Sequence, residues 1–420
     1  MNQLIYKILF VVLIISLWSS SLELSFLTSV LVLFVGLRSK ISRATSSFIV
    51  GLLILLLIGC VSIFTYDESW YGFLKDFIYF LRPITVLLAA YFTVVNLKEK
   101  RAFFDLLVLT GFGFAGIHLL EIAINIVSIG PDISKLRGEY GRTNHVEMIA
   151  LFIVICIKNI PIKKTRYKIV YQVFVVCLFV SFILYFSRTM FLVLFLMVLA
   201  YKGFLKLNGR GIVALILLAI LGGIAMFFIN QYEPKTEDPG ILGAFALKIK
   251  NSYTEAFKPI DIDPTKNDKR ELWDHWRAFE ANLVYDKIED EKAWVLGAGF
   301  GSTVDVGFEI RLQGEFIRYL PTTHNGLAYV YLKTGILGLL LYLFLIATLY
   351  LYYYSKRDSE GEISYNNLLA ACAFYMFISS VVVTGIFKPY DMVTLLIGGT
   401  FALKQHFYFE DRNIRNEGDT

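Results

Sequence analysis

The sequence alternates long apolar runs with short polar connections along most of its length. An α-helix needs about 20 apolar residues to cross about 30 Å of hydrocarbon, and most of these runs approach that length. Backbone polar groups in lipid must be bonded within the chain, so such runs form helices. The pattern predicts an all-α, polytopic membrane protein with about twelve transmembrane helices. The expected spans cover residues 4–20, 22–37, 45–64, 76–95, 103–127, 145–160, 169–186, 189–204, 211–229, 326–354, 364–384 and 390–406.

Basic residues are divided unequally between the two sides of the predicted membrane. One set of connections holds clusters, for example Lys164 with Arg166, whereas the other set holds isolated residues such as Arg188 and Lys388. Lys and Arg favour the cytoplasmic side. With an even number of spans, we expect both termini in the cytoplasm. The formal net charge of +5 is therefore sorted by membrane side, and no basic patch for nucleic acid is expected.

Residues 230–323 form a segment too long for this charge rule, and we expect one large extracytoplasmic loop. The segment has 12 basic and 17 acidic residues, which gives a net charge of −5. Two stretches carry apolar residues at helical spacing and predict amphipathic helices. These residues are Leu242, Phe245, Ile249 and Tyr253 in the first stretch, and Leu272, Trp276, Phe279 and Leu283 in the second.

The tenth apolar run is too long for one simple span. We expect residues 324–334 to form an interfacial helix and the span proper to begin at Gly335. The chain then divides into transmembrane helices 1–9 at residues 1–229, the large loop, a unit of interfacial helix and transmembrane helices 10–12 at residues 324–406, and a cytoplasmic tail at residues 407–420.

Most sites of familiar chemistry are excluded. All four cysteines lie inside apolar runs without metal-ligand spacing, and there is no P-loop or zinc-protease helix. Asp261 and Asp263 resemble the metal-binding pair of nucleotide-sugar transferases. They fall in a proline-rich stretch outside the expected membrane, so we interpret them as solvated carboxylates and expect no metal site.

Three short motifs stand close to one another in the second half of the chain. Residues 297–301 read Gly-Ala-Gly-Phe-Gly, residues 323–327 read Thr-His-Asn-Gly-Leu, and residues 335–339 read Gly-Ile-Leu-Gly-Leu. Residues 187–189, between two expected spans, read Ser-Arg-Thr. Together with one long outer loop, this pattern resembles the O-antigen ligase and O-antigen polymerase superfamily. Thr323 departs from the small apolar residue that often precedes the histidine.

The resemblance implies a multi-pass glycosyltransferase of the bacterial cytoplasmic membrane. The donor would be an oligosaccharide on undecaprenyl pyrophosphate, and a hydroxyl of an acceptor glycan would attack its anomeric carbon. No cofactor is implied. Because no ligand cluster lies near the His-Asn motif, we also expect catalysis without a divalent metal.

Such a transfer needs a base near the acceptor hydroxyl and fixed positive charge at the leaving pyrophosphate. His324 is the candidate base, because histidine titrates near neutral pH. The alternative is an interfacial histidine that helps to cap the following helix. Asn325 is a candidate substrate ligand, although a local cap or loop anchor suits it better than a catalytic role.

Arginine suits the pyrophosphate, because its planar fork binds phosphate oxygens in pairs and stays charged. Arg188 lies in a very short turn at the expected outer face, and Arg142 lies at the start of the sixth span. Either side chain could instead reach the membrane surface. Arg270 opens the second amphipathic helix and matches an arginine-rich start in the family. Ion pairs among Arg270, Asp274 and Arg277 on one helix face are the alternative.

Arg82 is unusual because it lies within a span. Arg82 and Glu121 each stand about six residues from the outer ends of adjacent spans, roughly 9 Å deep. Intramembrane charges are usually paired, so we expect either an Arg82–Glu121 pair or a substrate-binding role for Arg82. His118, one turn before Glu121, suggests a proton relay.

Two classes of function remain open. One is a polysaccharide polymerase or ligase, which differ in the acceptor; a ligase would transfer to a lipid A core or a similar acceptor of lipopolysaccharide. The other is a flippase for lipid-linked oligosaccharides, which should show an internal half-repeat that the sequence lacks. We favour the polymerase, with the bilayer and possible contact to a chain-length regulator protein as further partners.

The orientation gives a first prediction. Reporter enzymes fused at Lys164 should be active in the cytoplasm, and those fused at Asn267 should be active outside. Extracytoplasmic activity at Lys164 would reverse the topology and move the His-Asn motif to the wrong side for lipid-linked chemistry.

Overall fold

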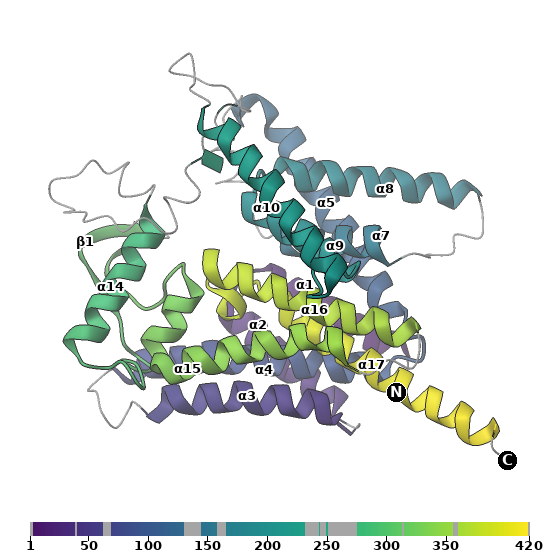
Figure 1. Cartoon of the computed structure of the whole chain (residues 1–420), viewed down its shortest axis with the longest axis horizontal. Helices are drawn as coiled ribbons and strands as arrows, with labels where there is room; N and C mark the ends of the chain where they lie inside the picture. The colour runs from purple at the N-terminus through teal and green to yellow at the C-terminus, as the bar shows by residue number, and fades with distance from the viewer. Residues whose placement is uncertain are drawn as a thin grey trace.

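A computed structural model describes residues 3–37, 40–61, 69–129, 144–157, 165–231, 243, 249–250, 275–312, 315–355 and 360–418. The helices form a bundle, and a smaller unit of helix and strands stands at one end (Figure 1). Several of the residues considered above lie outside the described residues, as does most of the first amphipathic stretch; they include Arg142, Lys164, Asp261, Asp263, Asn267, Arg270, Leu272 and Asp274.

Each of the twelve apolar runs contains a helix. The first nine helices are α1 (Gln3–Trp18), α2 (Leu22–Gly36), α3 (Arg43–Val61), α4 (Trp70–Asn96), α5 (Ala102–Ile129), α7 (His145–Cys156), α8 (Thr165–Leu184), α9 (Arg188–Tyr201) and α10 (Gly209–Asn230). The last three are α15 (Gly326–Leu351), α16 (Glu360–Val382) and α17 (Val393–Gly418), with short 3-10 turns η2 (Tyr352–Tyr354) and η3 (Gly385–Phe387).

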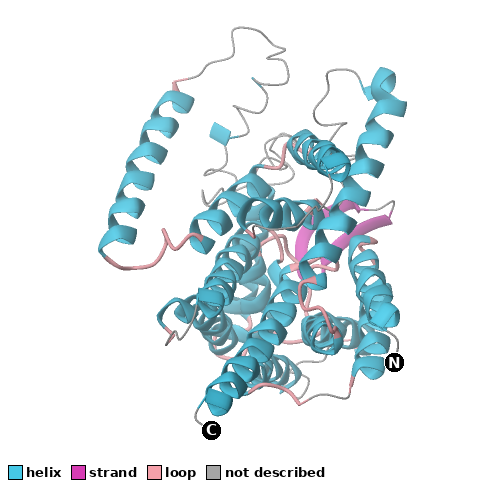
Figure 2. Cartoon of the chain, turned by 90° about the vertical axis from the view of Figure 1, so that its right-hand side faces the viewer, coloured by secondary structure: helices cyan, strands magenta, loops and turns pink. Residues whose placement is uncertain are grey.

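Six of the described helices are long and apolar enough to cross a membrane, namely α3, α4, α5, α10, α15 and α16. Helices α1, α2, α7, α8 and α9 are shorter and also apolar. Figure 2 shows how strongly helices dominate the molecule. The fold is therefore that of a multi-pass membrane protein. The number of spans, the side of each terminus and the unit boundaries remain predictions.

The described part of the large loop contains one helix and a hairpin of two strands. Helix α14 (Trp276–Asp290) covers most of the second amphipathic stretch, and β1 (Val304–Leu312) pairs antiparallel with β2 (Glu315–Leu320). The all-α expectation agrees with the helical bundle, and the hairpin is an addition to it that the sequence analysis did not expect. Val304, Val306 and Ile310 alternate along β1 and are buried against α14. On its exposed face, two hydrogen bonds from Arg318 lower the pKa of Asp305.

Helix α4 lies at the centre of the bundle. It packs chiefly against α17 and α2, and also against α3 and α1, so its sequence is buried around most of its circumference. Helix α16 joins the two halves of the bundle by packing against α9, α15 and α17. The first half of α4 contacts the turn between α16 and α17.

Helix α15 is broken at Gly335, the residue at which the span proper was expected to begin. Gly335 has φ 60° and ψ −163°, which are not helical angles. The break frees backbone groups, and the neighbouring Gly-rich turn bonds them: Ile336 N donates to Trp294 O at 2.8 Å, and Ala298 N donates to Leu332 O at 2.8 Å. Gly297, with φ 77°, lies directly against Gly335.

A buried ion pair fixes this turn to the bundle. Lys333 Nζ lies 2.6 Å from Asp76 Oδ2, and both side chains are almost fully buried. Asp76 also accepts hydrogen bonds from Gly301 N at 2.8 Å and from Tyr329 OH at 3.0 Å, while Lys333 donates to Ser302 O. Helix α4, the turn and the first half of α15 are therefore held together.

The close approach of Gly297 and Gly335 predicts that neither tolerates a side chain. A Cβ at Gly297 would lie 2.5 Å from Gly335 N and 2.7 Å from Leu332 O, and both glycines have positive φ. We expect Gly297→Ala and Gly335→Ala to destabilise the folded protein by more than about 2 kcal/mol. Thermal unfolding in detergent measures this loss. Gly113→Ala, at a helical glycine with nothing within 4 Å, is the matched control and should be neutral or stabilising.

Candidate functional site

The starts of three helices meet around one pocket of about 210 Å³. Asn144 and His145 at the start of α7, Ser187 and Thr189 at the start of α9, and His324 just before α15 line the pocket. A helix start carries unbonded backbone N–H groups and a partial positive charge. The side chains of Asn144 and Ser187 make no capping hydrogen bond, so these helix starts can bind an anion.

Two cationic side chains reach the same pocket from other elements. Arg277 comes from the first turn of α14, and Lys388 comes from the turn between α16 and α17. Lys388 Nζ donates to Tyr390 OH at 2.9 Å. No carboxylate is among the described residues that line the pocket. Positive charge from two side chains and partial charge from two helices therefore converge on one small space.

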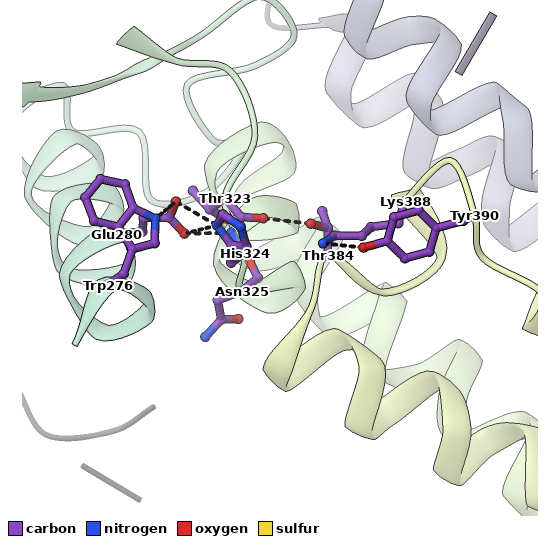
Figure 3. A network of polar contacts seen from close by, with 8 residues as sticks. All are labelled: Trp276, Glu280, Thr323, His324, Asn325, Thr384, Lys388 and Tyr390. Atoms are coloured by element: carbon purple, nitrogen blue, oxygen red, sulfur yellow. Dashed lines mark hydrogen bonds and ion pairs between the residues drawn. The ribbon is translucent and has the colours of Figure 1, made fainter. Parts of the chain in front are cut away.

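His324 lies at the edge of this pocket and is held by Glu280 of α14 (Figure 3). Glu280 is 1% exposed, whereas the side chain of His324 is 47% exposed. Glu280 Oε1 lies 3.0 Å from His324 Nδ1, and Oε2 accepts from His324 N at 2.6 Å. Trp276 Nε1 also donates to Glu280 at 2.6 Å, which fixes the carboxylate.

This arrangement determines which ring nitrogen of His324 can accept a proton. A carboxylate accepts hydrogen bonds and cannot donate one, so Nδ1 carries the proton of the neutral imidazole. The lone pair then lies on Nε2, the nitrogen that Glu280 does not contact. A half-exposed imidazole with a fixed tautomer is suited to act as a general base.

Asn325 is the N-cap of α15. Its side-chain oxygen accepts hydrogen bonds from Leu327 N at 3.0 Å and Ala328 N at 3.1 Å. Of the two interpretations from the sequence, the structure shows the local cap. The alternative stated for His324 was a cap made through Asn325 or through the histidine itself; the structure shows the cap through Asn325, and the imidazole contacts Glu280.

The structure describes only some of the candidate pyrophosphate ligands. Arg188 is half-buried at the first position of α9, between the pocket residues Ser187 and Thr189. Arg142 and Arg270 fall outside the described residues. Arg277, considered above only for ion pairs on its helix, lines the pocket itself.

The expected Arg82–Glu121 pair is wrong. Arg82 is fully buried, and its guanidinium donates to Pro389 O at 2.8 Å, to Ile386 O at 2.8 Å and to Lys388 O. Glu121 is exposed on α5. The depth argument assumed that consecutive spans pack together, but α4 packs chiefly against α17 and α2.

His118 does not form a relay with Glu121 either. Its Nδ1 lies 2.8 Å from Ser181 Oγ, which donates to Glu147 Oε2 at 2.6 Å. Tyr185 OH donates to the other oxygen of Glu147 at 2.8 Å. This buried network anchors α8 to α7 just before the turn at Ser187, so it supports the wall of the pocket.

Sequence reasoning missed the roles of Glu280, Lys388 and Tyr390. Glu280 lies at helical spacing within the apolar face of Trp276 and Phe279, and a carboxylate in such a face needs a partner. Lys388 is a basic residue in a short connection on the expected outer side, against the usual charge bias. The unusual positions of Glu280 and Lys388 are visible in the sequence, but the sequence does not show which residues these side chains contact.

Residues 173–343 match the family model described as O-Antigen ligase. This match covers less than half of the chain, so it is a similarity of one segment to that family. The matched segment begins within α8 and ends within α15, so it includes the start of α9, the Gly-rich turn, His324 and Gly335. The resemblance to the O-antigen ligase and polymerase superfamily is confirmed, and no curated protein or solved structure matches the chain.

The pocket at the starts of α7 and α9 should bind inorganic pyrophosphate. A hydrogen bond to a charged group is worth about 1.5–3 kcal/mol, so Lys388→Met and Arg277→Met should each weaken binding at least about tenfold. Calorimetric titration of the purified protein measures the Kd. Lys287→Met is the control, since Lys287 pairs with Glu291 and does not line this pocket. Equal Kd values for all variants would exclude this pocket as the anion site.

Proposed function

We propose that this protein is a surface-polysaccharide polymerase. It transfers a glycan from undecaprenyl pyrophosphate to a hydroxyl of an acceptor sugar at the outer face of the bacterial cytoplasmic membrane. The observation that carries the proposal is that a histidine held by a carboxylate adjoins a cationic pocket, and that the described residues lining this pocket include no carboxylate. Transfer from a pyrophosphate needs these two parts side by side.

In the proposed reaction, Nε2 of His324 accepts the proton of the acceptor hydroxyl. The oxygen bonds to the anomeric carbon of the donor, and the bond from that carbon to the pyrophosphate oxygen breaks. Glu280 stabilises the imidazolium that forms, because its carboxylate already bonds Nδ1. The proton on His324 then leaves to solvent or to the released pyrophosphate.

Negative charge grows on the leaving pyrophosphate during this step. Arg277 and Lys388 stabilise it, together with the starts of α7 and α9. Arg188, between two pocket residues, is a further ligand in the proposal, and Arg142 remains a candidate. Because fixed side-chain charges do the work that a divalent ion does in other transferases, we propose that the reaction needs no metal.

An O-antigen ligase is the second candidate, because the matching family model carries that description. The two enzymes share the donor, the base and the anion pocket, and they differ in the acceptor. A polymerase extends another lipid-linked chain, whereas a ligase transfers to a lipid A core or a similar anchor. A chain-length regulator is a possible partner only in the first case.

The glycans of a deletion strain test the function and separate these candidates. Loss of the polymerase should leave single repeat units on the lipid carrier, whereas loss of a ligase should leave long chains that are not attached. A normal surface glycan would contradict both.

The need for a metal is tested in vitro. The purified protein should polymerise lipid-linked units in the presence of a strong chelator. Activity that returns only when Mg²⁺ or Mn²⁺ is added would contradict metal independence.

The same assay tests the base. A general base contributes about 10²–10⁴ in rate, so His324→Ala should lower transfer at least about 100-fold with near-normal expression and Tm. Glu280→Gln should lower it about ten- to 100-fold, the worth of one charged hydrogen bond. Glu289→Gln, on the exposed face of the same helix, should have no effect. Near-normal chains from His324→Ala would remove His324 from the mechanism.

A further inference from the structure

The turn between α16 and α17 determines where two pocket residues lie. Residues 383–392 supply Lys388 and Tyr390 and contain only the short turn η3. Gly385 has φ 62°, and Pro389 lacks an N–H group. The turn forms several backbone hydrogen bonds of its own, but none of those described reaches the carbonyl oxygens of Ile386 and Pro389, which need partners from elsewhere.

Arg82 supplies those partners from the opposite side. Its two Nη atoms donate to the carbonyl oxygens of Ile386, Lys388 and Pro389. One of these carbonyls belongs to the pocket lysine, and another belongs to the residue that follows it. A planar guanidinium is the only side chain that offers donors in a rigid fork wide enough for several carbonyls at once.

The turn is also tied to the base. Thr384 Oγ1 donates to Thr323 O at 2.8 Å, the carbonyl immediately before His324 (Figure 3). Gly326 N donates to Val383 O at 3.2 Å. A Cβ at Gly326 would lie 2.8 Å from the carbonyl carbon of Thr384, so the two segments are in direct contact.

The charge of Arg82 is balanced within the same assembly. Asp391 is fully buried and attracts Arg82 electrostatically. Its carboxylate accepts from Val393 N at 3.1 Å and from Thr394 N at 3.2 Å, which caps α17. The end of the turn is therefore fixed to α17, and its middle is fixed to Arg82 of α4.

We propose that Arg82 is a positioning residue: through the turn it holds Lys388 in the anion pocket and the His324 segment beside it. Arg82 itself does not bind substrate, since it is 0% exposed and its Nη atoms already bond three carbonyls. This inference deepens the proposed function and rests on it for the meaning of the pocket, but the clamp on the turn can be tested without any activity.

Hydrogen exchange of the purified protein measures the clamp directly. The amides of Phe387, Lys388 and Asp391 are bonded within the turn, so their exchange reports its order. In Arg82→Lys the ammonium cannot replace the fork, and exchange should rise about tenfold or more at residues 385–391 and also at residues 321–327. Leu349→Ala is the control for general destabilisation, because it opens a buried position in the second half of α15, far along the helix from its start.

A second variant keeps the test decisive if Arg82→Lys fails to fold. Thr384→Val removes one hydroxyl with little change in volume, and it breaks the link to Thr323 only. Exchange should rise at residues 321–327 and stay unchanged at residues 387–391. Unchanged exchange of both segments in the two variants, or the same rise in Leu349→Ala, would overturn the proposal.

Binding of inorganic pyrophosphate separates positioning from stability. In an otherwise wild-type chain, Arg82→Lys should raise the Kd for pyrophosphate about tenfold. In a chain that already carries Lys388→Met, the positioned group is gone, and Arg82→Lys should raise the Kd less than about threefold. Equal factors in both backgrounds would mean that Arg82 acts on the fold alone. If the wild type does not bind pyrophosphate, the proposed anion site fails, and hydrogen exchange still decides whether Arg82 holds the turn.

Discussion

The site depends on the break in α15 at Gly335. Without the break, α15 would be one straight helix from its start to its end. With the break at Gly335, the first half of α15, which follows His324, can lie at an angle to the second half. Backbone groups freed inside a membrane are costly unless something bonds them. The turn at residues 293–299 does so, and it fits only because Gly297 meets Gly335 without side chains. The Gly-rich motif is thus a requirement of the break.

Charged side chains hold irregular backbone throughout this region. Asp76 and Lys333 bond the Gly-rich turn, Arg82 bonds the turn before α17, and Glu280 bonds the backbone N–H of His324. Burying a charge is costly unless hydrogen bonds satisfy it fully. Here the partners are peptide groups that also need satisfaction. Each such charge therefore fixes a loop that apolar packing alone would leave undetermined.

Much of the fold and part of the site follow from the sequence. Apolar run length predicted a helix in each of twelve places, and the His-Asn and glycine motifs indicated the family. The hairpin was missed because β1 lies in a segment that was expected only as loop and helix. The partners of Arg82, His324 and His118 could not be predicted, since they depend on which helices are neighbours. Arg82 meets residues about 300 positions away because α4 packs against α17 rather than α5.

The exposure of His324 bears on the length of the product under the proposed function. About half of its side chain is open, and the described residues around it form a small pocket on one side. In the proposed reaction, such a base would contact the terminal sugar of an acceptor and leave the remainder of the chain in water. The chemical step would then proceed alike for short and long acceptors. A defined chain length would have to come from competition between extension and removal of the chain.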